Sequence, residues 1–86
     1  MQRGKPDPEI YLNAAARLGV EPAVCVVFED SLAGLQAGLR AGMKVIALTT
    51  THSPEELHAA HLVIPDFTAL TVEAVVRVVH ADEFAR

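Results

Sequence analysis

The sequence is poor in several features that would each point to a particular class of protein. It has one cysteine in 86 residues, Cys25, which excludes an internal disulfide and is typical of a reducing compartment. No apolar run approaches the roughly 18 positions of a membrane-spanning helix, and the first residues, MQRGKPDPE, lack the apolar core of a signal peptide. Acidic residues (11) outnumber lysine and arginine (7), and a net charge of -4 argues against nucleic acid as a partner. We therefore expect a soluble, cytoplasmic protein that binds neither membrane nor nucleic acid.

The sequence is 51% hydrophobic. In some segments its apolar residues recur at helical spacing, and in others they form short continuous runs. Asp7 as N-cap, Pro8 at the first helical position and Gly19 at the end predict a first helix. Its expected apolar face comprises Tyr11, Ala14, Ala15 and Leu18. The short run 23–28, from Ala23 to Phe28, is apolar at consecutive positions, which predicts a strand covered on both faces, as in a parallel sheet.

The same alternation continues to the end of the chain. The further predicted elements are a helix over 32–41, a strand over 44–48, a helix over 54–60, a strand over 62–64 and a final helix over 72–79. Gly42 is the expected left-handed end of the second helix, and Ser53 with Glu56 forms a capping box for the third. The tail VVRVV has strong β propensity, but its valines recur at helical spacing from Val72 to Val79, which favours a helix. This order predicts the α/β class, with a partial Rossmann-like parallel sheet of about three strands flanked by helices, in one domain.

Two adjacent carboxylates, Glu29 and Asp30, follow the first strand directly. In open parallel α/β sheets, ligands bind beyond the carboxyl ends of the strands. Adjacent carboxylates repel each other unless a cation, a helix N-terminus or a base neutralises them, and Mg²⁺ accepts one or two carboxylates from a protein. The alternative is that Asp30 or Ser31 is simply the N-cap of the next helix, and the dipeptide alone leaves both interpretations open.

Two motifs in order decide between these interpretations. GKPDPE at 4–9, then VVFEDSLAG at 26–34 followed by AGMKVIAL, resemble the haloacid dehalogenase-like hydrolases, specifically their small-molecule phosphatases and β-phosphoglucomutases. The resemblance implies that Lys5 is catalytic and stabilises the phosphoryl group. It implies that Glu29 and Asp30 hold Mg²⁺, with Asp30 the better candidate for direct coordination. Ser31 in the motif and Thr49 after the second strand are the expected substrate-binding residues, although an ordinary polar loop is the alternative for Thr49.

The resemblance also implies that part of the family's catalytic apparatus lies elsewhere. The family's nucleophile is the aspartate of an Asp-x-Asp motif on an earlier strand, and no Asp-x-Asp occurs in this sequence. We therefore expect residues 1–86 to be the C-terminal part of a core domain, without its nucleophile strand and cap domain. The expected function is that of a C-terminal fragment of a magnesium-dependent phosphatase or phosphoglucomutase-type hydrolase. Its substrate would be a small phosphorylated metabolite, and the fragment would be inactive alone. The alternative is a non-catalytic binding or assembly module with a partial magnesium site.

In the family fold, the strand with the acidic pair lies beside the nucleophile strand. Without that neighbour, the run 23–28 would be an exposed apolar edge that can pair with another chain. We therefore expect self-association through this edge, or a missing half that is supplied separately.

Overall fold

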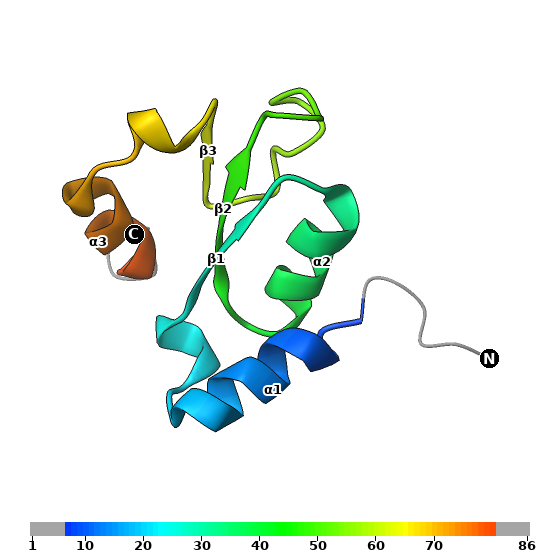
Figure 1. Ribbon diagram of the computed structural model, residues 1–86, viewed down its shortest axis with the longest axis vertical. Coiled ribbons are helices and arrows are strands. Elements are labelled where there is room, and N and C mark those ends of the chain that lie inside the picture. Colours follow the sequence, from blue (N-terminus) through cyan, green and yellow to red (C-terminus); the bar gives the residue numbers. More distant parts are fainter. Residues whose placement is uncertain (1–6, 81–86) are drawn as a thin grey trace.

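A three-stranded parallel sheet is the middle layer of the computed structural model, which describes residues 7–80 (Figure 1). Its strands are β1 (Val26–Glu29), β2 (Lys44–Leu48) and β3 (Leu62–Ile64), in the order β1-β2-β3. The helices are α1 (Glu9–Leu18), α2 (Leu32–Arg40) and α3 (Val72–Val79), with short 3-10 turns η1 (Pro22–Val24) and η2 (Phe67–Ala69). Helices α1 and α2 cover one face of the sheet, and α3 covers the other. The predicted fold class is confirmed.

Strand β2 lies at the centre of the sheet, and all five of its residues are buried. Because successive side chains of a strand point to opposite faces, Val45 and Ala47 pack on the side of α1 and α2. Ile46 and Leu48 pack on the side of α3. The core therefore consists of two small apolar clusters, one on each side of β2.

The helix ends follow the predicted sequence signals closely. Helix α1 begins at Glu9, one residue later than predicted, but Asp7 still serves its start, because Asp7 Oδ1 accepts a hydrogen bond from the Glu9 N–H at 2.9 Å. Gly19 ends α1 with φ 71°, and Gly42 follows α2 with φ 81°, both in the left-handed region that favours glycine. None of the helices in residues 7–80 is long and apolar enough to cross a membrane.

The helix predicted over 54–60 is wrong, because this segment forms a series of turns. The predicted capping box does form: the Ser53 N–H donates to Glu56 Oε1 at 2.9 Å, and the Glu56 N–H donates to Ser53 Oγ at 3.2 Å. Leu57 is the one buried residue between 53 and 60. The segment therefore lacks an apolar stripe, and a helix this short is not stable without one.

The strand predicted over 23–28 begins later and is more exposed than predicted. Pro22–Val24 forms a 3-10 turn, and the ladder with β2 begins only where Val26 meets Lys44. Phe28 is 37% exposed, so the expectation of two covered faces is wrong for this run, whereas β2 satisfies it. The reason is topological, because β1 is an edge strand of the described sheet.

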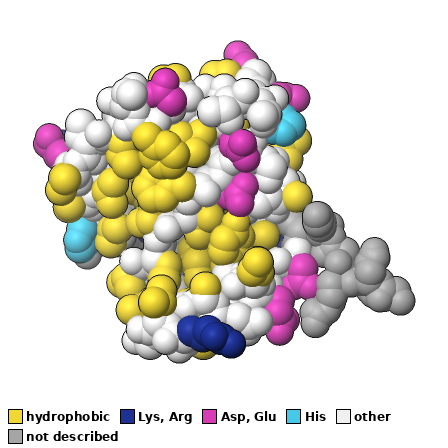
Figure 2. Space-filling view, viewed as in Figure 1, with side chains coloured by type: hydrophobic (Ala, Val, Ile, Leu, Met, Phe, Trp, Pro, Cys, Tyr) yellow, Lys and Arg dark blue, Asp and Glu magenta, His cyan; other side chains and the backbone are white. Residues whose placement is uncertain are grey.

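Apolar side chains stay exposed near this edge. Figure 2 shows them gathered over β1, α3 and the neighbouring part of α1. A groove of about 270 Å³ runs between α1 and β1 and is lined by all four residues of the predicted α1 face, Tyr11, Ala14, Ala15 and Leu18. On α3, Val72 is 82% exposed and Val76 is 49% exposed. Residues 7–80 therefore leave part of the predicted apolar faces of α1 and α3 exposed, although Ala15 of α1 is buried.

Candidate functional site at the carboxyl end of the sheet

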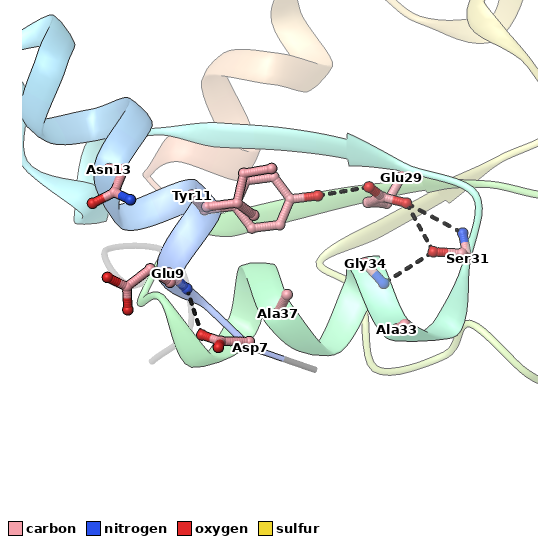
Figure 3. A pocket seen from close by; sticks show the side chains of 10 residues that line it. Asp7, Glu9, Tyr11, Asn13, Glu29, Ser31, Ala33, Gly34 and Ala37 are labelled. Atoms are coloured by element: carbon pink, nitrogen blue, oxygen red, sulfur yellow. Dashed lines mark hydrogen bonds between the residues drawn. The ribbon is translucent and has the colours of Figure 1, made fainter. Parts of the chain in front are cut away.

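Glu29 is the last residue of β1, and its carboxylate lies between α1 and the start of α2 (Figure 3). Its Oε2 accepts a hydrogen bond from the Tyr11 hydroxyl at 2.6 Å, and its Oε1 accepts one from the Ser31 hydroxyl at 3.0 Å. The backbone of Gly34 also lies close: a Cβ at position 34 would clash with the carboxyl carbon and both carboxyl oxygens of Glu29. The Ser31 N–H also donates to Oε1, at 3.4 Å, so three donors and a close backbone contact fix this carboxylate.

Asp30 turns to a different neighbour, the loop that follows β2. Its Oδ2 accepts a hydrogen bond from the Thr50 hydroxyl at 3.0 Å, and its backbone carbonyl accepts one from the Thr51 hydroxyl at 2.9 Å. Its other carboxylate oxygen, Oδ1, accepts no hydrogen bond from the residues that the structure describes. Hydroxyl donors thus stabilise both members of the acidic pair, and each member keeps its own set of donors.

Ser31 joins the acidic pair to helix α2. It is the N-cap of the helix: its Oγ accepts a hydrogen bond from the Gly34 N–H at 2.9 Å and donates to Glu29 Oε1. The capping alternative considered for Asp30 and Ser31 is therefore realised at Ser31. Asp30 remains outside the cap.

A cavity of about 610 Å³ opens beside Glu29, between the first turns of α1 and α2 (Figure 3). Tyr11 lines it and reaches across to the carboxylate. Burial raises the pKa of the Tyr11 phenol well above its ordinary value, and the hydrogen bond to Glu29 and its negative charge act in the same direction. The phenol therefore remains a proton donor to Glu29 at neutral pH.

The structure brings together some of the predicted site residues. Glu29, Asp30 and Ser31 lie at the carboxyl end of β1 as expected. Thr49 follows β2 at the same end of the sheet, but Thr50 and Thr51 make the contacts to Asp30. Lys5 lies outside the described residues.

Sequence reasoning missed the role of Tyr11, which it assigned only to the apolar face of α1. No local motif marks a contact between residues 18 positions apart, so the sequence carried no signal for it.

The donor set at this position fits a magnesium ion in type and in number. Mg²⁺ takes one or two carboxylates from a protein and fills its remaining positions with water or phosphate oxygens. Glu29 and Asp30 each have a carboxylate at this strand end, and Asp30 Oδ1 accepts no hydrogen bond from the residues that the structure describes. No group of three or more His, Cys, Asp or Glu side chains in residues 7–80 is arranged to hold a metal. These two residues could therefore supply part of the ligands of a metal site that also uses water or phosphate oxygens, but they do not form a complete protein site by themselves.

Comparison with known proteins gives one family. The sequence-family model described as haloacid dehalogenase-like hydrolase matches residues 1–42 of this chain. Validoxylamine A 7'-phosphate phosphatase of Streptomyces hygroscopicus subsp. limoneus is 48% identical over 68 residues, which are 79% of this chain and 32% of that protein. Hexitol phosphatase A of Escherichia coli is 42% identical over 72 residues, which are 84% of this chain and 33% of that protein.

The fold leads to the same family. The crystal structure of β-phosphoglucomutase from Clostridium difficile superposes with a TM-score of 0.81 at 30% identity, over 100% of this chain and 37% of that one. The chain therefore spans about a third of the length of these relatives. The resemblance expected from its motifs is confirmed: in sequence and in fold, this chain belongs with the haloacid dehalogenase-like hydrolases, and its relatives include β-phosphoglucomutases and phosphatases.

Proposed function

We propose that this chain supplies the metal-holding and phosphate-holding part of a magnesium-dependent phosphatase or phosphoglucomutase-type hydrolase that acts on a small phosphorylated metabolite. The observation that carries the proposal is the acidic pair at the carboxyl end of β1, of which Glu29 lines a cavity bounded by the first turns of two helices. Two of the relatives are named as phosphatases of small phosphorylated compounds, which supports this substrate class. The cytoplasmic location remains a prediction.

Each proposed residue has a distinct task. Asp30 and Glu29 would hold Mg²⁺, with Asp30 as the better candidate for direct coordination, because its Oδ1 accepts no hydrogen bond from the described residues. When bound, Mg²⁺ would offset negative charge on the phosphoryl oxygens. Lys5 would place its ammonium against the same oxygens, and Ser31 and Thr49 would contact the substrate. Positioning of this kind does not itself break a phosphate ester, because the attack on phosphorus needs a nucleophile.

The nucleophile would come from a part of the protein beyond these 86 residues. The absence of Asp-x-Asp from the sequence supports this assignment. In this proposal, residues 1–86 are the C-terminal part of a core domain, and its nucleophile strand and cap domain are not among them.

Hydrolysis of a generic aryl phosphate tests the division of labour. The 86-residue chain, Asp30→Asn and Lys5→Ala are compared with and without Mg²⁺, and released phosphate is measured. We expect no turnover above the metal-only control for any of the three. Turnover by the unmodified chain that both substitutions abolish would mean that this chain has its own nucleophile.

The exposed apolar surface favours a second candidate, a binding or assembly module. β1 is an edge strand of the described sheet, and the groove beside it is lined by apolar side chains. We propose that the chain associates through β1, with a second copy or with the rest of a catalytic domain. Sedimentation velocity of the 86-residue chain tests the self-association, since a monomer at high concentration would contradict it.

A further inference from the structure

Tyr11 connects helix α1 to the acidic pair, although it lies outside both motifs. Its hydroxyl donates to Glu29 Oε2 at 2.6 Å, the short distance of a hydrogen bond to an ionised acceptor. We infer that Tyr11 is a positioning residue for the magnesium site: it holds the Glu29 carboxylate in the orientation from which that group binds the ion. The inference rests on the proposed function and assigns it a residue that neither motif contains.

The surroundings of Glu29 leave its carboxylate little choice of orientation. Tyr11 holds one oxygen, Ser31 holds the other, and the backbone at Gly34 lies where any larger residue would displace the carboxyl group. Of these contacts, only the one to Tyr11 comes from α1. The other two come from the first turn of α2 and its cap. The Tyr11 hydroxyl therefore holds Oε2 from the side of α1, whereas Ser31 and Gly34 contact the carboxylate from the start of α2.

A hydrogen bond of this kind leaves the carboxylate able to bind a cation. Each carboxylate oxygen has two lone pairs, and Tyr11 uses one of those on Oε2. Carboxylates that bind metals are usually held by hydrogen bonds from an outer shell of residues, and loss of one such partner typically weakens metal affinity about 10-fold to 100-fold. The Tyr11 hydroxyl is placed as such a partner.

A purely mechanical role for Tyr11 makes a different prediction. If the hydroxyl only fastened α1 to β1, its loss would lower stability, and the affinity of the folded chain for Mg²⁺ would not change. Measuring both quantities on the same variants separates the two roles.

The experiment is a calorimetric titration of Mg²⁺ into the 86-residue chain, with urea unfolding of each variant in parallel. Tyr11→Phe removes only the hydroxyl, and Gly34→Ala displaces Glu29 from the α2 side. Gly38→Ala is the matched control, because its added Cβ would lie 2.8 Å from a methyl of Val45, away from the acidic pair. Asp30→Asn tests the proposed metal site itself. As an independent readout, the ring NMR signals of Tyr11 are identifiable, since it is the single tyrosine of the chain.

We expect Tyr11→Phe and Gly34→Ala to raise the Mg²⁺ dissociation constant about 10-fold or more. Gly38→Ala should stay within about a factor of two of the unmodified chain, because the atoms nearest its added Cβ belong to Val45 and Val27 and not to the acidic pair. In an NMR titration with Mg²⁺, the Tyr11 ring signals should shift with the same midpoint Mg²⁺ concentration as the binding measured by calorimetry.

If Asp30→Asn abolishes binding and Tyr11→Phe leaves the dissociation constant unchanged, the proposed site stands and the role of Tyr11 is refuted. If the unmodified chain binds no Mg²⁺, or Asp30→Asn binds it equally well, the proposed site fails and this inference fails with it.

Discussion

Replacing Gly34 by alanine tests the packing of Glu29 against helix α2. Gly34 lies in the first turns of α2, where alanine normally favours the helix by about 0.5 to 1 kcal/mol over glycine. Here the new Cβ would clash with the carboxyl carbon and both carboxyl oxygens of Glu29. No small shift relieves three such contacts at once. The end of the flexible Glu29 side chain must therefore move, and we expect it to lose hydrogen bonds to Tyr11 and Ser31.

The energetic cost follows from the hydrogen bonds that Glu29 would lose. A hydrogen bond to a charged group contributes about 1.5 to 3 kcal/mol, and part of this returns when the half-buried carboxylate meets water. After the helix-propensity gain is subtracted, we expect Gly34→Ala to lower the free energy of unfolding by about 1 to 3 kcal/mol. With a urea m-value near 1 kcal/mol/M for a chain of this size, the midpoint should fall by about 1 to 3 M.

Urea unfolding followed by far-UV circular dichroism measures this loss. Tyr11→Phe and the double variant complete a double-mutant cycle. Because both single changes break the same hydrogen bond, their effects should be non-additive by about 1 kcal/mol. Gly38→Ala with Tyr11→Phe is the control pair and should be additive. A Gly34→Ala chain that is more stable than the unmodified one would refute this description of Glu29.

Three further predictions concern other parts of the molecule. Leu57→Ala should lower the free energy of unfolding by about 2 to 5 kcal/mol, because Leu57 is fully buried; a loss below about 1 kcal/mol in urea unfolding would mean that the turns around it are not anchored. His61→Ala should cost about 1 to 3 kcal/mol in the same assay, since the buried Val45 N–H donates to His61 Nδ1 at 3.1 Å and would lose its acceptor; an unchanged midpoint would contradict this. The Tyr11 phenol should titrate above its ordinary pKa of 10.0, measured by tyrosinate absorbance, and Glu29→Gln should lower the midpoint. Because folding raises this pKa, its contribution to stability is complete below pH 10 and declines as pH rises above it; an unshifted midpoint in the unmodified chain would contradict the contact.

Much of the fold was predictable because the local signals agree with the tertiary structure. β2 and β3 have their predicted bounds, and the tail is a helix as its valine spacing indicated, despite its β propensity. Gly42 has the expected left-handed conformation, and Gly19 ends α1 as predicted. At these positions the hydrophobic period and the backbone preference point to the same element.

The errors arise where a local signal has no tertiary support. Ser53 and Glu56 make the predicted capping contacts, yet no helix follows, because Leu57 alone is buried there. The run 23–28 is apolar enough for a central strand, but it lies at an edge, which depends on neighbours outside the run. Val72 on α3 is exposed for a similar reason: a periodic pattern predicts an apolar face but not what covers it.

The candidate site divides in the same way. Motif and strand position were sufficient to place Glu29, Asp30 and Ser31 at the carboxyl end of β1. The contact between Tyr11 and Glu29, and that between Thr50 and Asp30, join segments that are distant in sequence. Only the packing of α1 and the β2 loop against β1 determines them.

The most direct test of the central claim is calorimetric titration of Mg²⁺ into the unmodified chain and Asp30→Asn, with Asp66→Asn as a control. Asp66 is an exposed aspartate that caps η2 and is not a member of the acidic pair. The account predicts that the unmodified chain and Asp66→Asn bind Mg²⁺ alike and that Asp30→Asn does not bind it. Equal binding by Asp30→Asn, or no binding by the unmodified chain, would contradict the claim that β1 ends in a magnesium site.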